Sequence, residues 1–312
     1  MRWLARHQQR EAERAEWRAR NVPAAPPGPF VYKTTPEGLQ LTLAVHCPQG
    51  WKKDDRRTAM VLFEGGGFSP PEGQDAGQSA AVGSRRIEPG AGFSMQAGYF
   101  AKRGAVAVRV GYRKHKRDGA SPEKAIEDAI SAMRWVRKSA SKLGIDPDRI
   151  VSAGGSSGGN LAASVACLTE FQAAEDDRSV SPRPNAMLLY FPLLDWLEGG
   201  SMTERFLAAL GGDKQRAARL SPARHWNRDM PPALILIGTR DPMYPTLEKF
   251  AAKWKSAGAP IDTYIAEGGP HGFSNYSPWL EKSTARADQF LRSIGFLADR
   301  PAADLPARQK AR

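Results

Sequence analysis

The sequence predicts an α/β protein built on a mostly parallel β-sheet that is covered by helices on both faces. Short apolar runs rich in valine, isoleucine and leucine recur along the chain, as expected of strands that are buried on both faces. Segments with helical periodicity lie between them. The 312 residues contain no internal repeat, and 41% hydrophobic with 25% charged residues is ordinary for a soluble globular protein. We therefore expect one folded domain.

The folded domain is expected to span residues 30–298. Residues 1–29 read as a charged helix with an arginine at every fourth position, followed by a proline-rich linker, and residues 299–312 as a basic tail. The net charge is +12, but the basic clusters are far apart in the sequence and no nucleic-acid-binding motif accompanies them. We therefore expect solvated charge and no specific nucleic-acid partner.

The secondary structure follows from local patterns. Residues 30–47 alternate apolar and polar side chains around a Pro-Glu-Gly turn, which predicts an antiparallel hairpin. Ser121 and Pro122 suit the start of a helix that continues at helical spacing and ends near Gly144. The other expected strands lie at 59–63, 105–110, 150–151, 186–191, 233–237 and 261–266, and a closing amphipathic helix at 282–296.

The sequence also limits the classes of protein to consider. The two cysteines, Cys47 and Cys167, indicate no disulfide framework, and the scattered histidines form no zinc motif. The N-terminus has no secretory signal, and no apolar run reaches the roughly 18 residues of a membrane span. We expect a cytoplasmic protein without a metal or another cofactor; secretion is the alternative if translation starts upstream of Met1. A homodimer is compatible with the sequence.

The most informative motif is a serine pair between glycines, at residues 154–159. An apolar run precedes the pair and small helix-forming residues follow it, which is typical of a nucleophile elbow between a strand and a helix. Both Ser156 and Ser157 satisfy the G-x-S-x-G pattern, so the residues alone leave the nucleophile open. A structural turn is the alternative, because glycine and serine populate turns for conformational reasons.

A serine nucleophile needs a base and a group that orients the base. His271 lies between glycines in the loop after the last expected strand, and Asp241 directly follows the strand at 233–237. Asp241 could instead cap a helix, and Asp195, after an earlier strand, is the alternative acid. The chain order Ser, Asp, His is that of α/β hydrolases.

The donors for a developing oxyanion are expected in the loop Glu64-Gly65-Gly66-Gly67-Phe68. Three glycines leave backbone N–H groups unobstructed, so that a substrate oxygen can approach them. A loop of this kind can also cradle a phosphate, but the glycine patterns of nucleotide-binding loops are absent there.

Over residues 30–298 the chain resembles the hormone-sensitive-lipase-like and BD-FAE-type acetyl esterase branch of the α/β hydrolases. Four motifs carry the resemblance: the glycine loop at 64–68, the serine motif at 154–159, and the segments around Asp241 and His271. The resemblance implies an α/β-hydrolase fold with an eight-stranded sheet and a small cap at about 196–226. It implies Ser156 as nucleophile, with Asp241 and His271 completing the triad. The implied oxyanion donors are Gly66, Gly67 and Ser157, and we expect Phe68, Trp196 and Phe273 to bind the substrate.

Two features depart from the family pattern. Glu64 replaces a frequent histidine before the glycines, and its charge would oppose an oxyanion unless it is paired, for which Arg113 is our candidate. The loop 69–93 is long, and loops of this length are often functional.

We expect a serine esterase that cleaves short-chain carboxylic esters, including those of acetylated sugars or oligosaccharides, because a small cap suits small acyl groups. A peptidase of the prolyl-oligopeptidase type is one alternative, disfavoured because the sequence contains no N-terminal propeller. A non-catalytic hydrolase-fold binding protein is the other, but this chain keeps the serine, the acid and the histidine.

Overall fold

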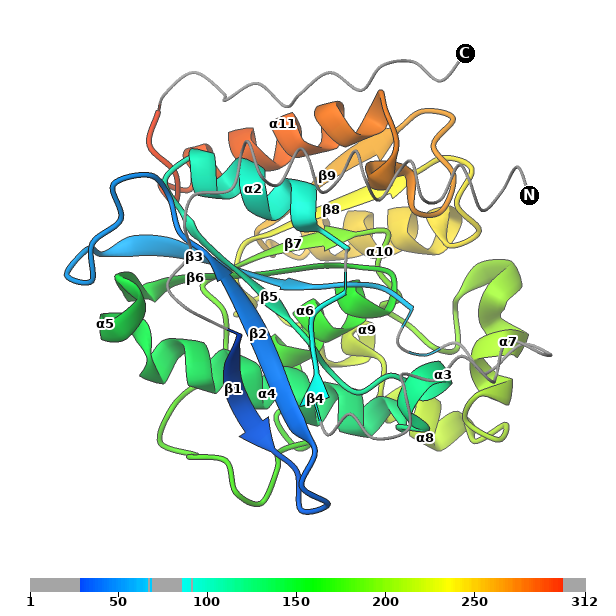
Figure 1. The fold of residues 1–312 in the computed structure, drawn as a ribbon. Helices are drawn as coiled ribbons and strands as arrows, with labels where there is room; N and C mark the ends of the chain where they lie inside the picture. The colour runs from blue at the N-terminus through cyan, green and yellow to red at the C-terminus, as the bar shows by residue number, and fades with distance from the viewer. Residues whose placement is uncertain (1–28, 67, 69–85, 91, 300–312) are drawn as a thin grey trace, which may run out of the picture.

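The computed structural model describes residues 29–66, 68, 86–90 and 92–299 (Figure 1). The expected charged helix and almost all of the linker lie outside the described residues. So do most of the loop 69–93 and all but the first residue of the basic tail.

The apolar runs form one sheet. In the described part of the chain its main path has the order β1-β2-β5-β3-β6-β7-β8-β9. β2 pairs antiparallel with β1 and with β5, and every neighbouring pair from β5 to β9 is parallel. The strands are β1 (Phe30–Thr34), β2 (Gln40–His46), β3 (Arg57–Phe63), β5 (Val106–Val110), β6 (Ile145–Gly155), β7 (Ala186–Tyr190), β8 (Ala233–Gly238) and β9 (Ile261–Ala266). The mostly parallel sheet is confirmed, but in the described residues it has nine strands and not the expected eight, because the short β4 (Arg86–Ile87) pairs with β2.

Helices cover both faces of this sheet. Figure 1 shows α2 (Ser94–Lys102) and α11 (Trp279–Ser293) on one face, and α4 (Pro122–Lys138) and α6 (Ser157–Cys167) on the other. β7 and β8 are buried along their whole length, which explains why they read as continuous apolar runs without alternation. The remaining helices are α3 (His115–Asp118), α5 (Ala140–Leu143), α7 (Thr203–Ala208), α8 (Lys214–Arg219), α9 (Pro222–His225) and α10 (Tyr244–Ser256), with 3-10 turns η2 (Gly200–Met202) and η3 (Phe273–Asn275).

The helix expected from Ser121 to Gly144 is interrupted. α4 begins after Ser121 with Pro122 in its first turn, but its regular hydrogen bonding ends at Lys138 and the short α5 follows. Gly144 then ends α5 with φ +62°, a conformation in which glycine avoids the penalty of a Cβ atom. The Ser121 side chain makes no capping hydrogen bond, so the position is as expected and the capping contact is not.

The closing helix lies three residues earlier than expected. α11 starts directly after Pro278 and ends before Gly295, which has φ +74°. Its apolar face, including Leu280 and Leu291, packs into the core. Polar residues lie between these apolar positions, so the sequence pattern does not define the first and last residue of the helix.

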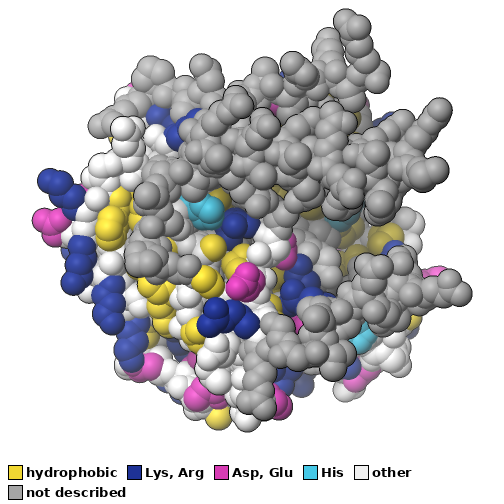
Figure 2. Space-filling view, in the orientation of Figure 1, with side chains coloured by type: hydrophobic (Ala, Val, Ile, Leu, Met, Phe, Trp, Pro, Cys, Tyr) yellow, Lys and Arg dark blue, Asp and Glu magenta, His cyan; other side chains and the backbone are white. Residues whose placement is uncertain are grey.

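Charged side chains are dispersed on the face that Figure 2 shows. Lysine and arginine side chains lie there with aspartate and glutamate side chains between them, and do not gather into one patch. The described part of this face therefore carries charges of both signs.

Candidate active site

Ser156 lies at the turn from β6 to α6 in a conformation that residues with a side chain rarely adopt, with φ 57° and ψ −121°. The glycines around it make the turn feasible. A Cβ atom on Gly154 would overlap the carbonyl oxygen of Gly158, and one on Gly158 would overlap that of Phe63. Ser157 is instead the buried first residue of α6. The strained position of the motif is therefore that of Ser156.

The structure brings His271 to this serine. His271 Nε2 lies 3.0 Å from Ser156 Oγ, and His271 Nδ1 lies 2.7 Å from Asp241 Oδ2. The Asp241 side chain is fully buried, whereas that of His271 is 42% exposed. With an ionised aspartate and a neutral imidazole, Nδ1–H donates to the carboxylate and Nε2 accepts from the serine hydroxyl. This tautomer is the one that a general base requires.

The loops after β8 and β9 are in direct contact, which explains how Asp241 and His271 meet. The Arg240 backbone N–H donates to Gly269 O over 3.0 Å, and a Cβ atom on Gly238 would overlap that same oxygen. Asp241 is held further by its own N–H, which donates to Gly238 O, and by Oδ1, which accepts from the Met243 N–H.

Asp195, the alternative acid, is occupied elsewhere. Its Oδ1 accepts from the Leu197 N–H and from Ser221 Oγ, and its Oδ2 lies 2.9 Å from Arg224 Nε. These contacts hold the segment that follows β7. Asp241 is thus the carboxylate that the structure pairs with His271.

Two of the expected oxyanion donors lie beside the serine. Gly66 has φ +83° and lines the same cavity as Ser156, and Gly67 lies outside the described residues. Gly65 packs against the elbow, since a Cβ atom there would lie 3.1 Å from Gly155 O. Ser157 begins α6, where backbone N–H groups have no acceptor within the helix and the helix dipole favours negative charge.

Glu64 is paired, but not with the expected residue. Its Oε1 lies 2.6 Å from Lys114 Nζ, whereas the Arg113 guanidinium binds Asp128 and Glu127 on α4. The expected Glu64–Arg113 pair is therefore wrong by one position. Adjacent residues of an extended chain point to opposite sides, so Arg113 faces α4 while Lys114 faces Glu64.

The cavity above Ser156 has a volume of about 260 Å³. Phe68 lines it as expected. Trp196 and Phe273 do not: both are fully buried, Trp196 behind Phe68 at a ring distance of 5.0 Å and Phe273 behind Phe191 at 5.8 Å. The wall consists of Gly66, Phe68, Ser156, Ser157, Leu193, Met202, Arg205, Phe206, Asp241, Pro242, Met243 and His271.

Several of these wall residues are not among those expected from the sequence. Met202 and Phe206 come from η2 and α7, whose approach to the serine depends on the path of the whole segment between β7 and β8. Pro242 and Met243 could have been found, because they directly follow Asp241 at the carboxyl end of β8, where open α/β sheets bind ligands.

Neither a metal site nor a membrane span is found in the described residues. No group of three or more His, Cys, Asp or Glu side chains there could hold a metal ion. None of the helices in that part of the chain has the length and apolar character needed to cross a bilayer.

A serine elbow at the centre of a mostly parallel sheet, with an acid and a histidine on the loops of later strands, defines an α/β hydrolase. The chain belongs to the α/β-hydrolase fold family, whose model matches residues 97–275. This agrees with the resemblance that the four motifs carry.

Two of the curated relatives that this chain resembles are named esterases. Esterase LipI of Mycobacterium tuberculosis is 29% identical over 212 residues, which cover 61% of this chain and 62% of the relative. An acetylxylan esterase of Xylanibacter ruminicola is 26% identical over 259 residues, 78% of this chain and 48% of the relative. The chain thus spans less than two thirds of the length of these curated relatives.

Solved structures match over more of their length. The apo form of Thermogutta terrifontis esterase 2 has a TM-score of 0.76 and 36% identity, covering 89% of this chain and 98% of that one. The propionate-bound form has a TM-score of 0.75 and 36% identity, covering 89% and 97%.

Proposed function

We propose that this protein is a carboxylic ester hydrolase that cleaves short-chain esters through a Ser156–His271–Asp241 triad. The observation that carries the proposal is the pair of contacts made by one imidazole, 3.0 Å to Ser156 Oγ and 2.7 Å to Asp241 Oδ2. Both distances lie within hydrogen-bond reach, as nucleophilic catalysis by serine requires.

Acylation begins when Ser156 Oγ attacks the ester carbonyl carbon and His271 Nε2 takes the hydroxyl proton. The buried Asp241 carboxylate stabilises the imidazolium that forms. Backbone N–H groups of Gly66, Gly67 and Ser157 donate to the tetrahedral oxyanion, a type of contact worth about 10²–10³ in rate per donor. The alcohol then leaves with the proton from His271, and the acyl group stays on Ser156.

Deacylation repeats these steps with water. His271 Nε2 takes a proton from a water molecule, whose oxygen attacks the acyl carbon. When the second tetrahedral intermediate collapses, the proton returns to Ser156 Oγ, and the carboxylic acid is released. The chemistry needs no cofactor.

Short acyl groups are favoured by the size of the site. A cavity of about 260 Å³ lies below the roughly 300–1,000 Å³ that is usual for drug-sized ligands. Propionate, a short-chain carboxylate, is bound in one structure of Thermogutta terrifontis esterase 2, which supports the same range. Acetylated sugars or oligosaccharides are a substrate class within it, for which the acetylxylan esterase among the relatives is the support.

The domain limits also belong to this proposal. Residues 30–298 would form the hydrolase domain, with 196–226 as a small cap. The cytoplasmic location and the homodimer stay predictions, which cell fractionation and light scattering test.

Hydrolysis of p-nitrophenyl acetate, butyrate and octanoate tests the function. The parent protein should hydrolyse acetate and butyrate faster than octanoate, and Ser156→Ala should lose at least about 10³-fold in kcat. Ser157→Ala is the matched control and keeps its backbone N–H, so it should retain most of the activity. Loss of activity in Ser157→Ala alone would overturn the choice of nucleophile.

A parent protein without esterase activity would instead favour the non-catalytic binding protein. Cleavage of a prolyl peptide with no cleavage of esters would favour the peptidase. These outcomes separate the three classes with one purified protein and two kinds of substrate.

A further inference from the structure

Glu64 directly precedes the three glycines of the glycine loop, and both of its carboxylate oxygens accept hydrogen bonds. Oε1 accepts from Lys114 Nζ at 2.6 Å and from the Gly90 N–H at 3.1 Å, while Oε2 accepts from the Gly92 N–H at 3.1 Å. The two glycines fit closely around it, because a Cβ atom on Gly92 would lie 2.7 Å from that of Glu64. The carboxylate thus joins the segment before α2 to the glycine loop.

The backbone of the loop is held by the same group of residues. Lys114 Nζ donates to Gly65 O over 3.3 Å, and Tyr112 Oη donates to Glu64 O over 2.7 Å. Burial raises the pKa of Tyr112, so its hydroxyl remains a proton donor. Two consecutive carbonyl groups next to the oxyanion donors are therefore fixed by side chains.

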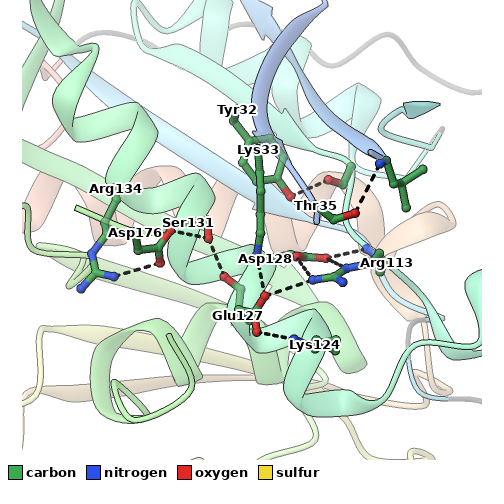
Figure 3. A network of polar contacts seen from close by, with 12 residues as sticks. Tyr32, Lys33, Thr35, Arg113, Lys124, Glu127, Asp128, Ser131, Arg134 and Asp176 are labelled. Carbon is green, nitrogen blue, oxygen red and sulfur yellow. Dashed lines mark hydrogen bonds and ion pairs between the residues drawn. The ribbon is translucent and has the colours of Figure 1, made fainter. Parts of the chain in front are cut away.

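Lys114 is itself anchored to the core through its neighbour. The Arg113 N–H donates to Asp128 Oδ2 over 3.1 Å, and its guanidinium donates to both oxygens of that carboxylate (Figure 3). Lys33 from β1 binds Asp128 as well, and Asp128 is fully buried on α4. The chain from Tyr112 to Lys114 is thus fixed against α4, with Lys114 directed toward Glu64.

The charges explain why a pair is needed here. A lone carboxylate at the base of an oxyanion site would raise the energy of the transition state, because it repels the developing negative charge. The Lys114 ammonium neutralises Glu64 at 2.6 Å, and both side chains are only 16% exposed, so water screens them incompletely.

We propose that Glu64 and Lys114 are positioning residues, which hold Gly65 and Gly66 in the geometry that binds the oxyanion while cancelling each other's charge. This rests on the proposed esterase function. Neither residue lines the cavity of Ser156, so they act through the backbone of the glycine loop and not on the substrate.

The test compares Glu64→Gln, Lys114→Met and the double variant. Glu64→Gln keeps the shape and should lower kcat about tenfold, since a displaced catalytic contact costs up to ~10² in rate. Lys114→Met leaves the Glu64 carboxylate without the cation that neutralises it. This variant should lower kcat by about 10², a loss like that of one oxyanion donor. The double variant should recover to the level of Glu64→Gln. KM should change less than about threefold, as for a contact made only in the transition state.

Asp176→Asn is the matched control. Asp176 forms a comparably buried ion pair with Arg134 of α4, at 2.9 Å, and accepts from Ser131 Oγ, so neither of these contacts involves Glu64 or Lys114. This variant should lower stability and keep kcat. Parent-like kcat in Lys114→Met, or an equal loss in Asp176→Asn, would overturn the proposal.

Hydrogen exchange separates this proposal from the esterase function. Glu64→Gln should speed amide exchange in the peptide that contains Gly65 and Gly66, whether or not the parent protein hydrolyses esters. An inactive parent with faster exchange in the variant would refute the esterase function and still show that Glu64 holds the glycine loop. An active parent with unchanged exchange and kcat would do the reverse.

Discussion

Ser156 Oγ lies 3.0 Å from His271 Nε2, although 115 positions separate the two residues in the sequence. The contact is possible because β6 and β9 are parallel members of one sheet, so the loops that follow them emerge at the same edge. The third residue, Asp241, joins from the strand next to β9. The sheet topology thus assembles the candidate triad.

Asp241→Asn should lower kcat by about 10³–10⁴ because the amide favours the wrong histidine tautomer. Asp195→Asn is its control, since that carboxylate binds Ser221 and Arg224 instead of His271. Steady-state kinetics with p-nitrophenyl butyrate measures both. An equal loss in the two variants would mean that Asp241 has no special role.

Gly158→Ala should destabilise the protein by about 1–3 kcal/mol and abolish most activity, because its Cβ atom would overlap the backbone of Phe63 beside the elbow. Gly258→Ala adds a side chain in open space at φ +81° and should cost only ~1 kcal/mol of backbone strain. Urea denaturation gives both free energies of unfolding. If Gly158→Ala lowers the free energy of unfolding by less than Gly258→Ala does, Gly158 does not lie this close to the Phe63 backbone in solution.

Phe206→Ala should shift the preference toward longer acyl chains, because Phe206 forms part of the wall of a small cavity. We expect the ratio of kcat/KM for octanoate to that for acetate to rise about tenfold, the scale of one or two methylene groups in an apolar pocket. Leu207→Ala, one residue further on α7 and outside the wall, is the control. An unchanged ratio in Phe206→Ala would place the acyl group elsewhere.

Much of the site could be predicted from the sequence because its residues directly follow buried strands. Ser156, Asp241 and His271 each occupy a loop at the carboxyl end of a strand, and glycines mark these loops. The partner of Glu64 could not be predicted in the same way. Choosing Lys114 over Arg113 requires knowing that Asp128 binds Arg113 from the other side, which depends on how α4 packs.

The aromatic side chains that line the cavity were harder to predict from the sequence, for a similar reason. Trp196 follows β7 by a few residues, but its side chain packs inward behind Phe68, and Met202 and Phe206 reach the cavity. Sequence position indicates that a segment is near the site. It does not indicate which of its side chains face the cavity.

Neither cysteine should react with a disulfide reagent at pH 8 in the folded protein. Burial raises the pKa of the Cys47 thiol to about 11 and that of Cys167 to about 12, so almost no thiolate is present. Since both pKa values are raised by folding above the ordinary thiol value of 9.0, the neutral thiols favour the folded state at and below pH 8, and this contribution is lost as the pH rises from about 9 through 11 to 12. Ellman's reagent should titrate no thiol in the native protein and both after unfolding. Rapid native reaction with loss of activity would point to a cysteine at the site.

Covalent labelling with paraoxon, which phosphorylates activated serines, tests the role of Ser156 most directly. Tandem mass spectrometry of the labelled protein should place one diethyl phosphate on Ser156 Oγ, with complete loss of esterase activity. Ser157→Ala should still be labelled, and Ser156→Ala should not. A phosphate on Ser157, or an active enzyme that loses no activity and gains no label, would contradict the assignment of Ser156 as the nucleophile.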